Sequence, residues 1–280
     1  MSDTANKNLE EKSSPRPMGL GFFLRKTRRK NPFPSENMED YMIRSFLVIV
    51  FLILFFIFSL IALPVEWVIG KFNPDVKAVS SLRIVQGAFH IILFLAGVHT
   101  TVTGLENIPD DEPVLFIGNH RGFFDVIISY TYMKRPTGFV AKKEMKKALI
   151  IRRWMDNLFC LFLDRENMKE GLKTILKGID YIKDGKSIVI FPEGTRNKGE
   201  GVQDFHAGSF KFAEKTGCKI IPMVQTNTDC IFERQFPRLK ATHTTLAFGK
   251  PIDVNSFPKE ERKKIAAYTH DVIVEMYEKE

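Results

Sequence analysis

The sequence predicts an α/β fold, in which a mainly parallel sheet is flanked by helices and preceded by N-terminal membrane helices. Three observations support this prediction. Short apolar segments typical of buried strands alternate with segments of helical length, polar motifs follow several of these strands, and a long apolar run precedes them all. The 280 residues then divide into a polar tail over 1–40, membrane-anchoring apolar segments over 41–100 and an α/β domain over 101–280.

The first 40 residues are polar, lack apolar periodicity and contain four prolines, so we expect a mobile tail. Residues 46–63 are apolar except for Ser59 and reach the length of ~18 residues that is typical of a membrane helix. A cleaved signal peptide is the alternative. The run starts late, however, and ends in Pro64-Val65-Glu66 without a small-residue cleavage site, which favours a membrane helix.

A second apolar run over 84–98 is shorter and contains polar residues, so a re-entrant helix, an interfacial helix and a buried core helix all fit it. Six basic residues lie between positions 25 and 44, whereas three lie between the two runs. Positive charge favours the cytoplasmic side, which predicts a cytoplasmic N-terminus. If the two runs form a helical hairpin, everything after residue 100 lies on the cytoplasmic face of the cell membrane.

Beyond residue 100 the expected elements alternate in type. The helix that ends near position 184 has Gly185 directly after it, a usual helix terminator. We predict strands over 114–117, 138–141, 159–163, 187–191 and 220–224, helices over 124–132, 143–157 and 167–184, a helix between the last two strands and another after residue 259. Because the carboxyl ends of parallel strands meet at one edge of a sheet, the polar motifs should gather at that edge.

The composition restricts the partners. Lys and Arg number 41 and Asp and Glu 33, a net charge of +8, which suits phospholipid headgroups, an acidic carrier protein or nucleic acid. Eight basic residues between 134 and 153 precede Trp154, a combination that suits anionic lipid, although a solvated helix face is an equally good interpretation. No nucleic-acid-binding motif accompanies them. The three cysteines have neither metal-ligand nor disulfide spacing, so we expect a reducing compartment. We also expect no metal, since the sequence shows no cluster of metal ligands, and no cofactor.

The first polar motif spans residues 119–125 and reads NHRGFFD. His120 and Asp125 cannot share a helical face at this spacing, but they can meet if His120 lies in the loop and Asp125 in the first turn of the next helix. The carboxylate would then orient the ring, whose other nitrogen would take a proton from a hydroxyl. Alternatively, the histidine bonds only to backbone and the aspartate favours the helix N-terminus.

The second group of polar residues suits a phosphate. The segment over 191–197 reads FPEGTRN, in which Gly194 allows a tight turn, Thr195 supplies a hydroxyl and Arg196 offers a planar fork for two phosphate oxygens. Arg165 follows another strand and adds a guanidinium at the same edge. An ordinary strand-ending turn and a solvated Asp164–Arg165 pair are the alternatives.

Taken in order, the motifs resemble those of the 1-acylglycerol-3-phosphate acyltransferase family. The resemblance covers roughly residues 100 to 250 and rests on four blocks, Asn119-His120 with Asp125, Leu163-Asp164-Arg165, Phe191 to Arg196, and Ile221-Pro222. It implies that His120 deprotonates an acceptor hydroxyl, that Asp125 orients His120, and that the alkoxide attacks an acyl thioester. It also associates the acceptor phosphate with a set of residues that comprises Arg165, Glu193, Gly194, Arg196 and, as weaker candidates, Thr195 and Lys142.

The family further implies acyl-CoA or acyl carrier protein as donor, lysophosphatidic acid as acceptor and phosphatidic acid as product. The segment over 148–153 departs from the proline and glycine that many members carry there. The family's preference for the length of the acyl chain therefore cannot be assigned to this protein. Glycerol 3-phosphate or another lysophospholipid is the alternative acceptor. A non-enzymatic membrane protein that binds anionic lipid is the second alternative, although it would need neither the base nor its partner.

Overall fold

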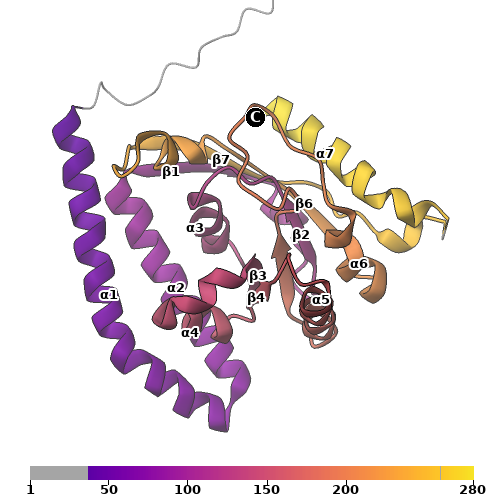
Figure 1. Ribbon diagram of the computed structural model, residues 1–280, viewed down its shortest axis with the longest axis horizontal. Helices are drawn as coiled ribbons and strands as arrows, with labels where there is room; N and C mark the ends of the chain where they lie inside the picture. The colour runs from indigo at the N-terminus through magenta and orange to yellow at the C-terminus, as the bar shows by residue number, and fades with distance from the viewer. Residues whose placement is uncertain (1–36, 259) are drawn as a thin grey trace, which may run out of the picture. The chain divides into compact units, whose positions relative to one another are not determined.

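The computed structural model describes residues 37–258 and 260–280, which belong to one compact unit (Figure 1). Most of the predicted polar tail, residues 1–36, lies outside the described residues. Residues 38–40 of that predicted tail already belong to the first helix.

Two long helices, α1 (Met38–Phe72) and α2 (Pro74–Ala96), form an antiparallel hairpin. Asn37 and Asp40 form a capping box that starts α1, and Pro74 occupies the first turn of α2. Gly97 ends α2 with a φ of 68°, a left-handed conformation that glycine adopts without strain. Both helices are long and apolar enough to cross a membrane by length and composition.

Protein covers one side of the hairpin, and the other side is exposed and apolar. Side chains such as Phe46, Ile53 and Ile61 of α1 are 65%, 53% and 71% exposed. The covered side carries buried polar groups: Trp154 Nε1 donates to Ser59 Oγ at 2.9 Å. The hairpin therefore packs as part of the core rather than standing apart from it.

The second predicted apolar run is the C-terminal half of α2. Its Gln86 is buried and donates to the backbone carbonyls of Tyr130, Thr131 and Met133 at the end of the third helix. Of the three interpretations of this run, the structure therefore favours a helix that is buried on one face.

The sheet has seven strands in the order β1-β7-β6-β2-β5-β3-β4. All neighbouring pairs are parallel except β6 and β7. The predicted class, a mainly parallel sheet flanked by helices, is confirmed. The strands are β1 (Val98–Thr103), β2 (Leu115–Gly118), β3 (Thr137–Lys142), β4 (Leu161–Leu163), β5 (Ser187–Ile190), β6 (Ile220–Thr226) and β7 (Thr242–Phe248).

Helices cover both faces of the sheet, because successive strand residues point to opposite sides. On one face Phe116 and Ile221 pack with α1, α2, α3 and α4, and on the other Leu115 and Ile220 pack with α5, α6 and α7 (Figure 1). The remaining helices are α3 (Phe124–Thr131), α4 (Leu149–Asn157), α5 (Met168–Lys183), α6 (Lys211–Thr216) and α7 (Ile265–Lys279). Short 3-10 helices are η1 (Leu105–Asn107), η2 (Lys143–Lys147), η3 (Ala207–Phe210), η4 (Thr228–Cys230), η5 (Glu233–Gln235), η6 (Val254–Ser256) and η7 (Glu261–Lys264).

Three details differ from the sequence prediction or sharpen it. The predicted helix over 143–157 is divided into η2 and α4, and β1 and β7 were not among the predicted strands. Pro222 lies in β6, an internal strand. Met223 pairs with Phe248, and Ile220 pairs with Ile252, so the segment that follows β7 has one more residue between these two pairs than β6 has. The proline therefore lies at a bulge, where a missing N–H is tolerated.

Candidate active site

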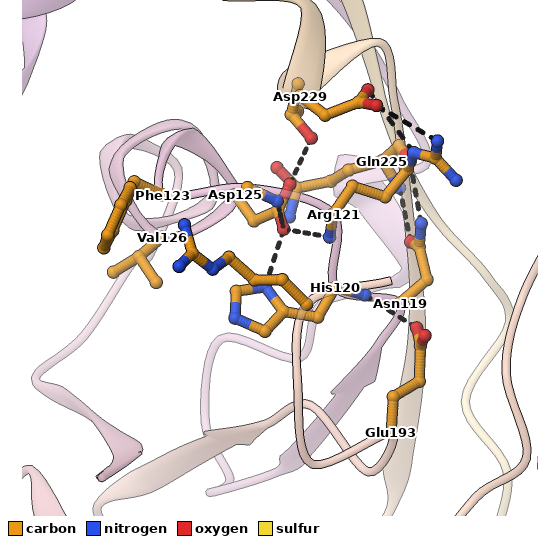
Figure 2. A network of polar contacts seen from close by, with 12 residues as sticks. Asn119, His120, Arg121, Phe123, Asp125, Val126, Glu193, Gln225 and Asp229 are labelled. Carbon is orange, nitrogen blue, oxygen red and sulfur yellow. Dashed lines mark hydrogen bonds and ion pairs between the residues drawn. The ribbon is translucent and has the colours of Figure 1, made fainter. Parts of the chain in front are cut away.

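The loops after β2, β5 and β6 meet at the carboxyl edge of the sheet, as predicted. His120 follows β2, Glu193 follows β5 and Thr228 follows β6. Buried Asn119 holds the ends of β2 and β6 together, since its Nδ2 donates to the Gln225 carbonyl at 2.9 Å and its Oδ1 accepts from the Gln225 amide at 2.8 Å. Figure 2 shows Asn119, Asp125 and Glu193 around His120.

His120 and Asp125 form the contact that their spacing permits. The distance from His120 Nδ1 to Asp125 Oδ2 is 2.7 Å, with Asp125 fully buried and the His120 side chain 20% exposed. The same carboxylate oxygen accepts from the amides of Arg121 at 2.6 Å and Gly122 at 2.8 Å (Figure 2). The other oxygen accepts from Thr228 Oγ1. Because an ionised carboxylate only accepts, Nδ1 carries the proton and the Nε2 lone pair is left for a ligand.

Three further contacts fix the position of His120. Its ring stacks on Phe191 with centroids 4.4 Å apart and planes within 10°. Its amide donates to Glu193 Oε1 at 2.8 Å, and its carbonyl accepts from the Asn197 amide at 2.7 Å. The two segments that the sequence singled out, 119–125 and 191–197, are thus joined through the backbone of the histidine.

Glu193 is buried and bonds to this backbone, so its carboxylate does not offer a direct phosphate contact. Burial raises the pKa of Glu193 to about 7, although hydrogen bonds from the amides of His120 and Gln203 oppose the rise. An ionised carboxylate beside a bound phosphate would also repel it. The geometry therefore indicates that Glu193 positions the histidine.

Arg196 lies beside the loop that carries the histidine. Its guanidinium lies 4.1 Å from the centroid of the Phe123 ring, and its Nη1 donates to Glu233 Oε1 at 3.1 Å. Glu233 also accepts from the Phe123 amide at 2.7 Å, and burial raises the pKa of Glu233 above its ordinary value. The side chain of Arg196 is 39% exposed, which leaves its remaining donors available.

The other predicted phosphate-binding residues lie in or near the same loop. Arg165 Nη1 donates to the Gly194 carbonyl, so the second-block arginine does reach this loop. Gly194 has a φ of 75°, and a Cβ there would lie 3.1 Å from the ring of His206. Thr195 is exposed. Lys142 ends β3 at the same edge, and among the described residues it makes no polar contact with this loop.

A buried ionic group and Glu233 were missing from the sequence prediction. Arg121 Nη2 lies 3.1 Å from Asp229 Oδ2, which also pairs with Arg234 Nη2 at 2.8 Å. Burial alone would raise the pKa of Asp229, but the two arginines lower it below its ordinary value. These acids lie in a segment without apolar periodicity, so only the three-dimensional contacts identify them.

The arrangement supplies an oriented base, a protein scaffold that fixes it and guanidinium groups nearby. A histidine of this kind can take a proton from a hydroxyl group. The adjacent arginines suit a phosphate on the molecule that carries the hydroxyl. These features fit group transfer to an alcohol by general base catalysis.

Comparisons with known proteins indicate an acyltransferase. The profile of the Acyltransferase family matches residues 99–226. A 1-acyl-sn-glycerol-3-phosphate acyltransferase of Borreliella burgdorferi is 30% identical over 198 residues, which are 71% of this chain and 79% of that protein. One from Haemophilus influenzae is 33% identical over 174 residues, 59% of this chain and 70% of that protein.

A solved structure resembles the fold. The crystal structure of the 1-acyl-sn-glycerophosphate acyltransferase PlsC from Thermotoga maritima has a TM-score of 0.71 and 19% identity, and the match covers 85% of this chain and 97% of that one. This likeness extends the agreement in fold to most of the chain.

Proposed function

The chain belongs to the 1-acyl-sn-glycerol-3-phosphate acyltransferase family, and from this premise we propose that it acylates the sn-2 hydroxyl of lysophosphatidic acid to give phosphatidic acid. The chain is an acyltransferase, and homologues named for this acceptor support the substrate. The observation that carries the mechanism is the 2.7 Å contact between His120 Nδ1 and buried Asp125.

His120 acts as the general base in this proposal. Asp125 holds the proton on Nδ1, so that Nε2 accepts the proton of the acceptor hydroxyl. The imidazolium that forms is stabilised by the adjacent carboxylate, which the amides of Arg121 and Gly122 hold in place. The protein itself forms no covalent bond to the acyl group.

The bond changes balance without another reactant. The acceptor oxygen loses its proton to Nε2 and forms a bond to the carbonyl carbon of the thioester. The tetrahedral intermediate then breaks its carbon–sulfur bond, and the leaving thiolate takes the proton from His120. The base is thereby restored, and the products are an ester and a free thiol.

The acceptor phosphate is assigned to the guanidinium groups around the 193–196 loop. Arg196 is the principal candidate, because it is half-exposed and already lies beside the loop that carries His120. Arg165 and the hydroxyl of Thr195 are further candidates, with Lys142 at the margin. Gly194 provides the turn, and Glu193 contributes indirectly by holding His120.

The donor and the cellular location follow from chemistry and charge. We assign acyl-CoA or acyl carrier protein as donor, since both present a thioester at a cytoplasmic surface. The exposed apolar side of α1 would contact membrane phospholipids, with the catalytic domain on the cytoplasmic face of the cell membrane. Nucleic acid is not part of this proposal.

The test is acyl transfer by the purified full-length protein in detergent, with oleoyl-CoA and lysophosphatidic acid as substrates. Glycerol 3-phosphate and lysophosphatidylcholine serve as rival acceptors. We expect phosphatidic acid from the unmodified protein and a loss of turnover on the order of 10²-fold or more in His120→Ala. Product only from a rival acceptor would move the substrate assignment, and full activity of His120→Ala would refute the base.

A further inference from the structure

A cavity of about 530 Å³ lies between the hairpin and α4. Its wall on the α1 side is apolar and includes Leu60, Leu63 and Trp67. From α2 and α4 it receives two cationic side chains, Lys77 and Arg153. An apolar wall together with two cationic side chains is a surface pattern that suits an anionic lipid.

This cavity is separate from the candidate active site. One of its lining residues, Asn157, precedes β4, and Asp75 near the start of α2 lies 3.6 Å from Lys186, which precedes β5. Both mark the amino edge of the parallel strands. His120 follows β2 at the carboxyl edge, so the acyl-transfer chemistry and the cavity lie at opposite edges of the sheet.

Lys77 and Arg153 have capacity for an anion. Within the described part of the chain, neither lies within ion-pair distance of a carboxylate. The acid in the cavity wall, Asp156, is paired with Arg152 at 3.5 Å. Asn157 is used as well, since it donates to Ser81 Oγ at 3.2 Å.

The nearby buried acid of α1 is also occupied. Glu66 is 3% exposed and accepts from the hydroxyls of Ser80 at 2.6 Å and Ser81 at 3.1 Å. Among the described residues, it forms no ion pair with Lys77 or Arg153.

The fold fixes the positions from which both cationic side chains extend. A Cβ at Gly70 would lie 2.5 Å from Lys77 Cδ, so the missing side chain allows the lysine stem to pass closely along α1. On α4, Trp154 is anchored to Ser59, which fixes the rotation of the helix. Arg153 and Asn157 are four residues apart and so share the face of α4 that lines the cavity.

We propose that this cavity binds an anionic membrane phospholipid at a site distinct from the substrate site. Its phosphate would lie between Lys77 and Arg153, and an acyl chain would follow the wall formed by Leu60 and Leu63. Trp67 and Lys71 indicate that the cavity lies at the depth of the lipid headgroups, where aromatic and basic residues concentrate. Lys71 Nζ lies 3.9 Å from the centroid of the Trp67 ring. The inference does not rest on the acyl-transfer proposal.

The chain offers a local reporter for the test. It has two tryptophans, of which Trp67 lines the cavity and Trp154 packs behind it through Ser59. Full-length protein in phosphatidylcholine–detergent micelles would be titrated with phosphatidylglycerol that carries brominated acyl chains, which quench tryptophan fluorescence on contact. We expect saturable quenching that brominated phosphatidylcholine does not reproduce at the same mole fraction.

The double variant Lys77→Gln/Arg153→Gln should weaken the apparent affinity on the order of 10-fold or more. The matched control is Lys169→Gln/Lys183→Gln, which removes the same charge from exposed positions of α5 and should leave the titration unchanged. Gly70→Ala is the second test, because alanine favours a helix yet its Cβ displaces Lys77. It should weaken binding without lowering the thermal midpoint.

Three results would overturn the proposal. Equal quenching by brominated phosphatidylcholine would indicate unspecific lipid contact, and an equal loss in the α5 control would indicate general surface charge. Reversal of the quenching by inorganic phosphate or glycerol 3-phosphate would indicate a site for free phosphate rather than lipid. Acyl transfer measured in the same micelles should persist in the double variant, and this readout separates the proposal from the fate of the catalytic assignment.

Discussion

Replacement of Asp125 by asparagine removes the charge beside His120 while keeping the shape of the side chain. One carboxylate oxygen accepts from His120 Nδ1 and from the amides of Arg121 and Gly122, whereas the other accepts from the hydroxyl of Thr228. A hydroxyl can reverse and accept, but an amide N–H cannot. We therefore expect the asparagine oxygen to face the three N–H donors and its NH₂ group to face Thr228.

With that orientation, Asp125→Asn keeps His120 in the same tautomer and changes only the electrostatics. The free energy of unfolding should fall by about 1 kcal/mol, because the three N–H donors keep their acceptor and only the hydroxyl of Thr228 changes from donor to acceptor. Unit charges about 4 Å apart interact by about 4 kcal/mol at an effective dielectric constant of about 20. If half to all of that stabilisation reaches the transition state, kcat should fall roughly 30- to 1,000-fold.

The assay is steady-state acyl transfer from oleoyl-CoA, combined with the thermal midpoint and the ¹⁵N chemical shifts of the His120 ring. The expected outcome is a protonated Nδ1, a nearly unchanged midpoint, an unchanged acceptor KM and the stated loss in kcat. If kcat fell less than about threefold with the tautomer intact, stabilisation of an imidazolium by Asp125 would be refuted. A flipped tautomer would refute the hydrogen-bond argument.

Three further substitutions separate acceptor binding from positioning of the base. Arg196→Ala should raise the acceptor KM on the order of 10-fold or more with a smaller change in kcat, because a charged hydrogen bond to phosphate is lost; an unchanged KM in kinetics with lysophosphatidic acid would contradict this. Glu233→Gln should raise the same KM less, and the double variant with Arg196→Ala should be no worse than Arg196→Ala alone, since both changes act on one contact. Glu193 has a pKa raised by burial from 4.5 to about 7, so the unfolded chain releases this proton first and stability should fall by up to about 3 kcal/mol as pH rises across that interval. In Glu193→Gln this pH dependence should be absent from thermal midpoints measured between about pH 5 and about pH 7.5.

Much of the architecture was predictable because buried parallel strands are short and continuously apolar. The segments around Phe116, Ile188 and Ile221 illustrate this, and each precedes a polar motif. In contrast, β1 reads VHTTVT and β7 THTTLAF, and their threonines conceal the strand pattern. Threonine is enriched in β-strands, but it does not give the apolar signal by which the other strands were predicted.

The candidate site was predictable where its residues are close in sequence. His120 and Asp125 are five positions apart, so the geometry of a loop followed by a helix is enough to predict that they can meet. Glu233 is more than a hundred residues from Phe123, whose amide donates to it, and nothing in its neighbourhood indicates a functional residue. The contact between Glu193 and His120 was also hidden, because it is made to a backbone amide and not to a side chain.

The contact between the hairpin and the α/β layers has a practical consequence for anyone who wants a freely soluble enzyme. A chain shortened to begin at residue 98 would lose Gln86, which would leave the carbonyls at the end of α3 without their donor, and would take Ser59 from the indole of Trp154. The apolar hairpin therefore contributes to the integrity of the fold and cannot be removed as a separate unit. Solubility would have to be engineered on the outward face of α1, for example at Phe46 and Ile61, with the inward face left untouched.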